Sequence, residues 1–491
     1  MTATRIDPEA LAGLASRALA DGTEDEAAPV LEAAARQLRT NARLWQWAGL
    51  LQRSLDEHEL ALSSFAEAAR LGPEDASIAH GHARVALEAG LDARQLFDRA
   101  LKLKPSGDVL LGRAAAGFGA GEGEAAADEL AAILEHNPLW AQGHIQWAQL
   151  ASMIGRADEA SVTVDRALAL HAGDKGLWQA ALHILVGAER HKEACEKANA
   201  AIAATGDTVA FALTRAAALS DAGEIERAET EFSRLGEPSD VNHAIHLARL
   251  QIRAGHWQRL FELAELWMRG ETAHHFWPYA SIAWRQAGDS RWQWLEGDER
   301  LVRTFDLTPK LSSLDALAER LRRIHTRSGR FLDQSVRGGT QTDGPLLSRI
   351  DPEIRELRAA IVEAVEEYRR QLPPADPAHP MLRHRRDRPI RFAGSWSVRL
   401  AAMGHHSHHV HPQGWISSAF YVAVPEALTG EEGWLTLGEP QSGLGLDLPP
   451  IRRIAPGRGQ LVLFPSMMWH GTLPFSAGER MTVAFDVALP R

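Results

Sequence analysis

Five of seven consecutive residues near the C-terminal end are histidines: His405, His406, His408, His409 and His411. Neutral imidazole is a common protein ligand for iron, zinc, copper and nickel. His409 and His411 are two residues apart, a spacing that places both side chains on one face of a strand. A third ligand, His470, follows a later strand-like run. The pattern predicts a three-histidine metal site with open coordination positions, as catalytic sites have.

Arg480 and Thr482, which follow His470 in the sequence, have the chemistry to bind an anion beside this metal. Arg480 offers a permanent charge and a planar fork that matches a carboxylate. Thr482 is two residues further on, so on a strand its hydroxyl points the same way and adds a hydrogen bond. The sequence therefore predicts a site for one metal ion and one small dicarboxylic co-substrate.

Each of these features also has a plainer interpretation. A histidine-rich run is often a solvated loop, and Arg480 could form a surface ion pair. His406 and His408 are a competing ligand pair with the same spacing. We favour His409 and His411 because they adjoin a strand-like run that would fix their direction. His405, His406 and His408 are then expected to be loop residues near the substrate.

Composition limits the classes of function that the chain could have. The chain has 491 residues, a formal net charge of −11 and one cysteine. The acidic balance argues against a nucleic-acid-binding surface, and one cysteine excludes a disulfide framework or a cysteine-based zinc site. The sequence shows no signal peptide and no run of about 18 apolar residues that would span a membrane. We therefore expect a cytoplasmic protein without a nucleic-acid or membrane partner.

Internal repeats occupy the first half of the chain. Alanines recur at intervals of 32 to 34 residues: Ala61, Ala93, Ala126, Ala160, Ala194 and Ala228. Four residues after each comes Phe65, Phe97, Leu130, Val164, Ala198 or Phe232. The small residues let two helices approach, and the larger apolar residues fill the space between them. The pattern resembles the tetratricopeptide repeat, an antiparallel helix pair that buries its apolar face by stacking on neighbouring pairs.

The C-terminal motifs resemble the 2-oxoglutarate/Fe(II)-dependent oxygenases. HVHPQGWISSAFYV is similar to the metal-binding strand of that superfamily, and FPSMMWH and ERMTVAF are similar to its distal-histidine and co-substrate-binding strands. The closest likeness is to a bacterial group that carries tetratricopeptide repeats in front, of which QSVRGGTQT (Gln334 to Thr342) is also typical. The resemblance covers roughly residues 325–491. The superfamily usually has Asp or Glu at the position of His411, so this set has one negative charge fewer.

The resemblance implies a set of roles for individual residues. Fe(II) would be held by His409, His411 and His470. The co-substrate 2-oxoglutarate would be bound by Arg480, with Thr482, Tyr421 and Ser417 as further cofactor-binding residues. The implied reaction is hydroxylation, and the repeats favour a protein or peptide substrate. The alternatives are that the array mediates homodimerisation or braces the catalytic domain, or that the chain is a scaffold whose metal-binding domain is inactive.

We predict an α+β chain with three parts: a helical array over residues 1–302, a connector over 303–330 and an oxygenase domain over 331–491. Leu314 to His325 and the segment after Asp351-Pro352 are expected to be helices that flank the domain. Short runs with turn signals between them indicate strands, which the resemblance places in a double-stranded β-helix or jelly roll. These runs are Trp396–Leu400, Trp415–Val424, Gly433–Leu437, Gln460–Phe464 and Met481–Val487.

Overall fold

The computed structural model describes residues 7–490, except 326–328, 330–331 and 333. The last part of the predicted connector therefore lies partly outside the described residues. The structure has an N-terminal array of helices and a C-terminal β domain, which confirms the predicted fold class. Within the described ranges, no helix is both long enough and apolar enough to cross a membrane.

The array is a succession of antiparallel helices. They are α1 (Pro8–Asp21), α2 (Glu24–Gln37), α3 (Ala42–Ser54), α4 (His58–Leu71), α5 (Ala76–Glu88), α6 (Arg94–Leu103), α7 (Gly107–Gly119), α8 (Gly123–His136), α9 (Ala141–Met153), α10 (Val162–Leu170), α11 (Lys175–Gly187), α12 (His191–Thr205), α13 (Val209–Asp221), α14 (Ile225–Leu235), α15 (Val241–Ala254), α16 (Trp257–Trp267) and α17 (Trp277–Ala287).

The small repeat positions lie where the helices pack. All six aligned alanines are buried, with at most 3% of their surface exposed. The ring of Phe65 lies against two glycines of neighbouring helices, so that a Cβ added at Gly49 would stand 2.7 Å from the ring and one at Gly81 2.3 Å from it. Small side chains are thus needed for the close approach of the helices, as the repeat pattern predicts.

Within the described residues, nine strands form two antiparallel sheets. The larger sheet has the order β1-β7-β4-β9-β3-β2 and the smaller one the order β6-β5-β8. The strands are β1 (Arg303–Asp306), β2 (Val336–Gln341), β3 (Phe392–His406), β4 (Gly414–Ala423), β5 (Leu435–Leu437), β6 (Arg452–Ile454), β7 (Gln460–Pro465), β8 (His470–Thr472) and β9 (Arg480–Ala488). Two helices flank the domain, α18 (Leu314–Ile324) and α19 (Pro352–Gln371).

Alternation along the strands separates the two faces of the larger sheet. On β4, Ile416 and Phe420 pack in one core with residues of α18 and α19. Ala419 and Tyr421 point the other way, into a core shared with Leu437 of the smaller sheet. The period of two thus places one face of β4 against the helices and the other between the two sheets.

Two segments differ from the sequence-based expectation. β3 extends to His406, so His405 and His406 end a strand and do not lie in a loop, because β2 pairs with this part of β3 and Val336 lies opposite His406. The glycine pair Gly338-Gly339 favours an ordered loop or a surface turn for the segment from Gln334 to Thr342, but most of this segment is the edge strand β2. The ladder tolerates its two glycines through an irregularity between Arg337 and Gly339, where Gly338 takes a φ of 68°.

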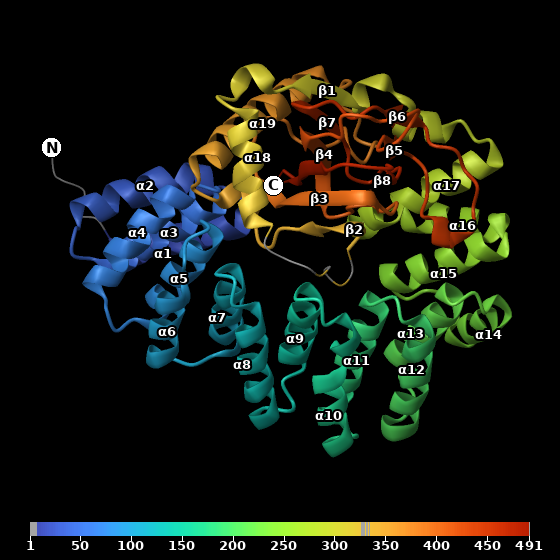
Figure 1. Cartoon of the computed structure of the whole chain (residues 1–491), viewed down its shortest axis with the longest axis horizontal. Helices are drawn as coiled ribbons and strands as arrows, with labels where there is room; N and C mark the ends of the chain where they lie inside the picture. The colour runs from blue at the N-terminus through green and yellow to red at the C-terminus, as the bar shows by residue number, and fades with distance from the viewer. Residues whose placement is uncertain (1–6, 326–328, 330–331, 333, 491) are drawn as a thin grey trace.

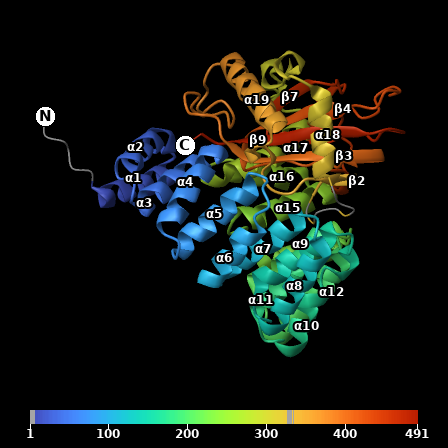
Figure 2. The same cartoon turned by 60° about the vertical axis from the view of Figure 1, so that its left-hand side comes forward.

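The array curves around the β domain and contacts it at both ends (Figure 1). At the N-terminal end, Arg388 lies 2.8 Å from Asp25 of α2. At the C-terminal end, the indole of Trp469 donates a hydrogen bond of 3.1 Å to the carbonyl of Pro278 in α17. In the turned view, the middle helices α8–α12 lie below the sheets (Figure 2). The concave side of the array therefore faces the β domain.

Candidate metal and co-substrate site

His409, His411 and His470 converge, as the sequence predicts. Their ligand nitrogens all lie within 4.8 Å of one another. His409 and His470 are joined by two backbone hydrogen bonds, of 2.9 and 3.0 Å, which bring the segment before β4 against the start of β8. The ring centroids of this pair are 4.2 Å apart. We refer to these three residues as the histidine triad.

Each triad ring has a protein contact at its Nδ1 atom. Nδ1 of His409 lies 2.8 Å from the carbonyl oxygen of Ser407, and Nδ1 of His470 lies 2.9 Å from that of Met468. A carbonyl only accepts, so each Nδ1 carries the proton and donates. Nε2 is then the nitrogen whose lone pair a metal ion can bind, and in His409 it lies 3.4 Å from the hydroxyl of Ser335.

His411 has a different partner. Its Nδ1 lies 2.7 Å from Oδ2 of Asp486, a residue of β9. The contact lacks hydrogen-bond geometry, but the charge of the carboxylate favours a proton on Nδ1 and so leaves Nε2 as the ligand atom, as in the other two rings. All three imidazoles therefore present the same nitrogen to the space between them.

Burial keeps two of the triad rings neutral. Loss of hydration lowers the pKa of His409 and of His470 well below the ordinary value, and the neighbouring imidazoles lower both pKa values further. Neutral imidazole is the form that binds metal, so these rings need not release a proton before they bind it. The donor set of three nitrogens fits a first-row transition metal such as iron.

The other histidines of the run point elsewhere. Nε2 of His408 lies 2.7 Å from the hydroxyl of Thr436 and 3.3 Å from the carboxylate of Glu439. His406 is half-buried beside the triad, and its loss of hydration, with the charge of Arg480, lowers its pKa to about 3. The pair His406 and His408 therefore does not form the metal-ligand cluster.

Arg480 and Tyr421 form a second, buried part of the site. Arg480 is 2% exposed and Tyr421 is fully buried, and the guanidinium carbon lies 5.1 Å from the centroid of the phenol ring. Among the described residues, Nε and Nη1 of Arg480 and the hydroxyl of Tyr421 have no hydrogen-bond partner. Buried polar groups are almost always paired, so these atoms fit a carboxylate ligand such as one end of 2-oxoglutarate.

The last two predicted cofactor-binding residues lie at different places. Thr482 is buried and lies on the same face of β9 as Arg480. Ser417 lies at the triad end of the site, where its hydroxyl donates a 2.5 Å hydrogen bond to Asp486. Ser417 therefore contacts the carboxylate that faces His411, while Thr482 is next but one to Arg480 along the strand.

A cavity of about 600 Å³ opens beside the triad. His409 and His411 line it from the β domain, together with Asp486. The opposite wall comes from the array and includes Asp221, Asn242, His246, Arg249 and Tyr279. The volume lies in the range of roughly 300 to 1,000 Å³ that is typical of ligand sites.

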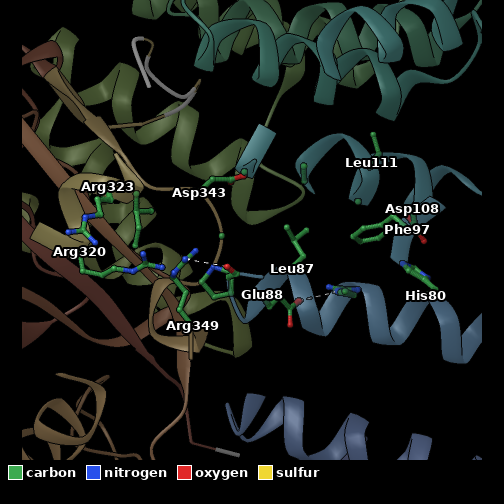
Figure 3. A pocket seen from close by; sticks show the side chains of 18 residues that line it. His80, Leu87, Glu88, Phe97, Asp108, Leu111, Arg320, Arg323, Asp343 and Arg349 are labelled. Carbon is green, nitrogen blue, oxygen red and sulfur yellow. Dashed lines mark hydrogen bonds and ion pairs between the residues drawn. The ribbon is translucent and has the colours of Figure 1, made fainter. Parts of the chain in front are cut away.

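A second cavity, of about 510 Å³, lies where α5 and α7 face α18. Figure 3 shows arginines such as Arg320 and Arg349 on one side of it and Phe97 and Leu111 on the other. The histidines of the triad are not among its lining residues. The cavity that adjoins the triad is therefore the one placed for chemistry.

Comparison with known protein families identifies the β domain. Residues 394–486 match the family described as "Putative 2OG-Fe(II) oxygenase". The match includes every residue of the triad, Arg480 and Asp486. We therefore call the β domain the oxygenase domain. The family implies Fe(II) and 2-oxoglutarate as cofactor and co-substrate, and the triad with Arg480 is the part of the domain that fits them.

Solved structures with some similarity are helical-repeat proteins. A tetratricopeptide repeat protein from Parabacteroides merdae is 20% identical, with a TM-score of 0.31, and the match covers 48% of this chain and 95% of that one. MamA from Desulfovibrio magneticus is 15% identical, with a TM-score of 0.30 and coverages of 35% and 99%. YrrB, described as having an unusual peptide-binding site, is 20% identical, with a TM-score of 0.25 and coverages of 38% and 96%. No curated protein sequence matches the chain.

Sequence reasoning missed two parts of the site. Asp486 was not predicted, although it alternates with Arg480 and Thr482 on β9 and so shares their face. The period of two could have identified it. The cavity wall formed by α13 and α15 was also missed, and no local pattern in the sequence shows which repeat will face the triad.

Proposed function

We propose that the chain is an Fe(II)- and 2-oxoglutarate-dependent dioxygenase that hydroxylates a protein or peptide substrate. One observation carries this proposal: three imidazoles whose ligand nitrogens converge lie in the same domain as a buried arginine and tyrosine with polar atoms that have no hydrogen-bond partner among the described residues. The bound iron and 2-oxoglutarate would supply the oxidising chemistry. The residues of the chain bind, orient and shield these groups.

The triad supports this role through its fixed geometry. The Nδ1 contacts of His409, His411 and His470 hold the rings in place before any metal arrives. Three protein ligands of this kind would hold an iron ion and leave it able to bind further ligands. The same geometry would hold the ion close to the cavity of about 600 Å³, where a substrate could approach it.

Arg480 supports binding of the far carboxylate of 2-oxoglutarate. A guanidinium in a buried place gains much more from a carboxylate than one in water, because the local dielectric is low. The hydroxyl of Tyr421 is a second donor beside it. Together they would hold the dicarboxylate in one orientation, so that its other end points away from Arg480.

The cavity wall supports a polypeptide substrate. The charged groups on the wall are paired with one another: Arg249 lies 3.3 Å from Asp221. They therefore do not select strongly for an ionic ligand. The amides of Gln334, Gln341, Gln441 and Asn242 also line the cavity. A carboxamide both donates and accepts, so it matches the peptide group of an extended chain.

Anaerobic addition of Fe(II) and 2-oxoglutarate tests the cofactor assignment. We expect a charge-transfer band in the visible range. Glutarate, which has both carboxylates but no 2-oxo group, is the matched control and should give no band. Absence of the band with 2-oxoglutarate in folded protein would contradict the proposal. Iron-dependent release of succinate would exclude the alternative of an inactive scaffold.

Substrate class is tested with peptide arrays and mass spectrometry. Neutral polar peptides are expected to gain one oxygen more readily than small metabolites do. Asn242→Ala should weaken this reaction and leave the charge-transfer band unchanged. The control is Asn199→Ala, because Asn199 contacts Arg215 of α13 and is not among the residues that line the cavity. An equal effect of both variants would contradict a role for this wall.

A further inference from the structure

Asp486 contacts a member of the triad in a way that the other two histidines do not share. Nδ1 of His411 faces the Asp486 carboxylate at 2.7 Å, whereas the Nδ1 atoms of His409 and His470 face backbone carbonyls. A carboxylate carries a full negative charge and is the stronger acceptor. His411 is thus the triad residue whose electron density and orientation are set by an ionised group.

The Asp486 carboxylate is itself held in place. The hydroxyl of Ser417 donates a 2.5 Å hydrogen bond to its Oδ1. Ser417 and Asp486 are directly opposite each other on β4 and β9. The same hydroxyl lies 3.0 Å from that of Ser466, whose carbonyl accepts the backbone N–H of His411 at 2.9 Å. Contacts from Ser417 and Ser466 therefore hold Asp486 and His411 in place relative to each other.

The charge of Asp486 is available to His411. Among the described residues, the carboxylate contacts His411 and Ser417, and neither is a permanent cation. Asp486 is also largely buried, with 8% of its surface exposed, so solvent screens its charge only weakly. A divalent ion held by three neutral imidazoles has no charged ligand, and Asp486 places one negative charge a single imidazole ring away.

We propose that Asp486 is a positioning residue for the metal site. It would orient His411 from the Nδ1 side of the ring and offset part of the charge of the bound ion. Ser417 is the support of this carboxylate. The inference rests on the proposed function only in taking the triad as a metal site, and it does not require 2-oxoglutarate or turnover.

The test is Co(II) binding to the full-length, metal-free protein, followed by visible absorption and by calorimetry. Asp486→Asn keeps the shape of the side chain and removes its charge. We expect its Kd for Co(II) to rise by about 10- to 100-fold, as for other groups that support a metal ligand. Asp306→Asn is the control, because Asp306 accepts a hydrogen bond from Thr308 at the end of β1, and its Kd should stay at the wild-type value.

Ser417→Ala gives a second, graded variant. It leaves the carboxylate in place without its support, so we expect a smaller rise in the Kd than for Asp486→Asn. This variant carries the test if Asp486→Asn fails to fold, which thermal unfolding of the metal-free protein would reveal. Wild-type Kd values for Asp486→Asn, or for Ser417→Ala if Asp486→Asn does not fold, would overturn the proposal.

Proton NMR of the Co(II)-loaded protein locates the effect. The imidazole N–H protons of bound histidines are shifted far from the other signals by the paramagnetic ion. We expect Asp486→Asn to move one of these signals, that of His411, and to leave those of His409 and His470 in place. A common shift of all three, or X-ray absorption showing a carboxylate bound to the ion in place of an imidazole, would overturn a positioning role. Failure of the wild type to bind 2-oxoglutarate would contradict the proposed function but would not affect the conclusion on Asp486 and Co(II) binding.

Discussion

The imidazole end and the guanidinium end of the site differ in how far the protein satisfies their polar atoms. At the imidazole end, Nδ1 of His409 and Nδ1 of His470 each donate to a carbonyl oxygen, of Ser407 and of Met468, and Nδ1 of His411 lies at ion-pair distance from Asp486. At the guanidinium end, Nε and Nη1 of Arg480 and the hydroxyl of Tyr421 are buried and have no hydrogen-bond partner in the part of the chain that the structure describes. Both ends belong to the same β domain. The protein thus completes the orientation of its metal ligands and leaves its anion donors to be satisfied from outside.

The two ends also carry opposite energetic consequences. An oriented imidazole costs little to keep, because its N–H is paired and its ring is apolar enough to be buried. An unpaired buried guanidinium is costly, since its desolvation is not repaid by a partner. A dicarboxylate that pairs with Arg480 recovers this cost on binding. The guanidinium end is therefore where ligand binding should change stability most.

The largest effect should come from removing a triad residue. His470→Ala deletes one ligand and is expected to weaken Co(II) or Fe(II) binding by more than about 100-fold, beyond the loss caused by a supporting group. Calorimetric titration of the metal-free protein measures it. His408→Ala is the control, because His408 faces Thr436 and Glu439. Equal losses in both variants would show that the triad is not the metal site.

Arg480→Ala should affect the other ligand. We expect a loss of about 2 to 5 kcal/mol in the binding free energy of 2-oxoglutarate, the range for deleting one partner of a buried charge pair. Metal affinity in the absence of 2-oxoglutarate should be unchanged. Arg399→Ala is the matched control, since Arg399 on the neighbouring strand is 42% exposed and pairs with Glu479. A loss of metal affinity in Arg480→Ala would break the distinction between the two ends.

Tyr421→Phe should have a smaller effect in the same direction. It removes one hydroxyl that would donate to the carboxylate and keeps the ring against Arg480. The expected loss in 2-oxoglutarate binding is about 1.5 kcal/mol, as for a hydrogen bond to a charged group. Competition titration against the Fe(II) and 2-oxoglutarate band measures it. A loss as large as that of Arg480→Ala would mean that the phenol carries more of the binding than its single donor explains.

Arg480→Met should change the ligand-free protein least. Removing an unpaired buried charge and keeping the bulk of the side chain is expected to leave the free energy of unfolding unchanged or to raise it by about 1 kcal/mol. Denaturant unfolding without ligand measures this. For the wild type, 2-oxoglutarate at 100 times its Kd should add about 2.7 kcal/mol of stability, and the variant should lose this gain. A clear destabilisation of the ligand-free variant would show that Arg480 has a structural partner.

The sequence was sufficient for the parts of the molecule that follow a local period. The repeat alanines and the histidines two residues apart each encode a face of a helix or strand, and the structure places both as expected. The end of β3 was missed because the strand pairing of its last two residues, His405 and His406, comes from distant β2. Local composition does not show such a partner.

The array side of the cavity was beyond sequence reasoning for a similar cause. Arg249 reaches Gln441 of the oxygenase domain across 192 positions of sequence, at 3.2 Å. Which repeat meets which loop depends on the summed curvature of many helix pairs. The spacing of the alanines predicts the helix pairs but not the summed curvature of the array. Asp486, in contrast, lay within reach of a period-two pattern on β9.

The attachment of the solenoid at both of its ends has a mechanical consequence. A stack of helix pairs held at one end can flex like a spring, because each pair touches only its neighbours. Here the contact of Arg388 with Asp25 and the contact of Trp469 with Pro278 attach both ends of the helical array to the oxygenase domain. If one repeat bends, the other repeats or the oxygenase domain must then move to accommodate the change. A substitution as remote as α2 would therefore change the width of the cavity beside the histidine triad.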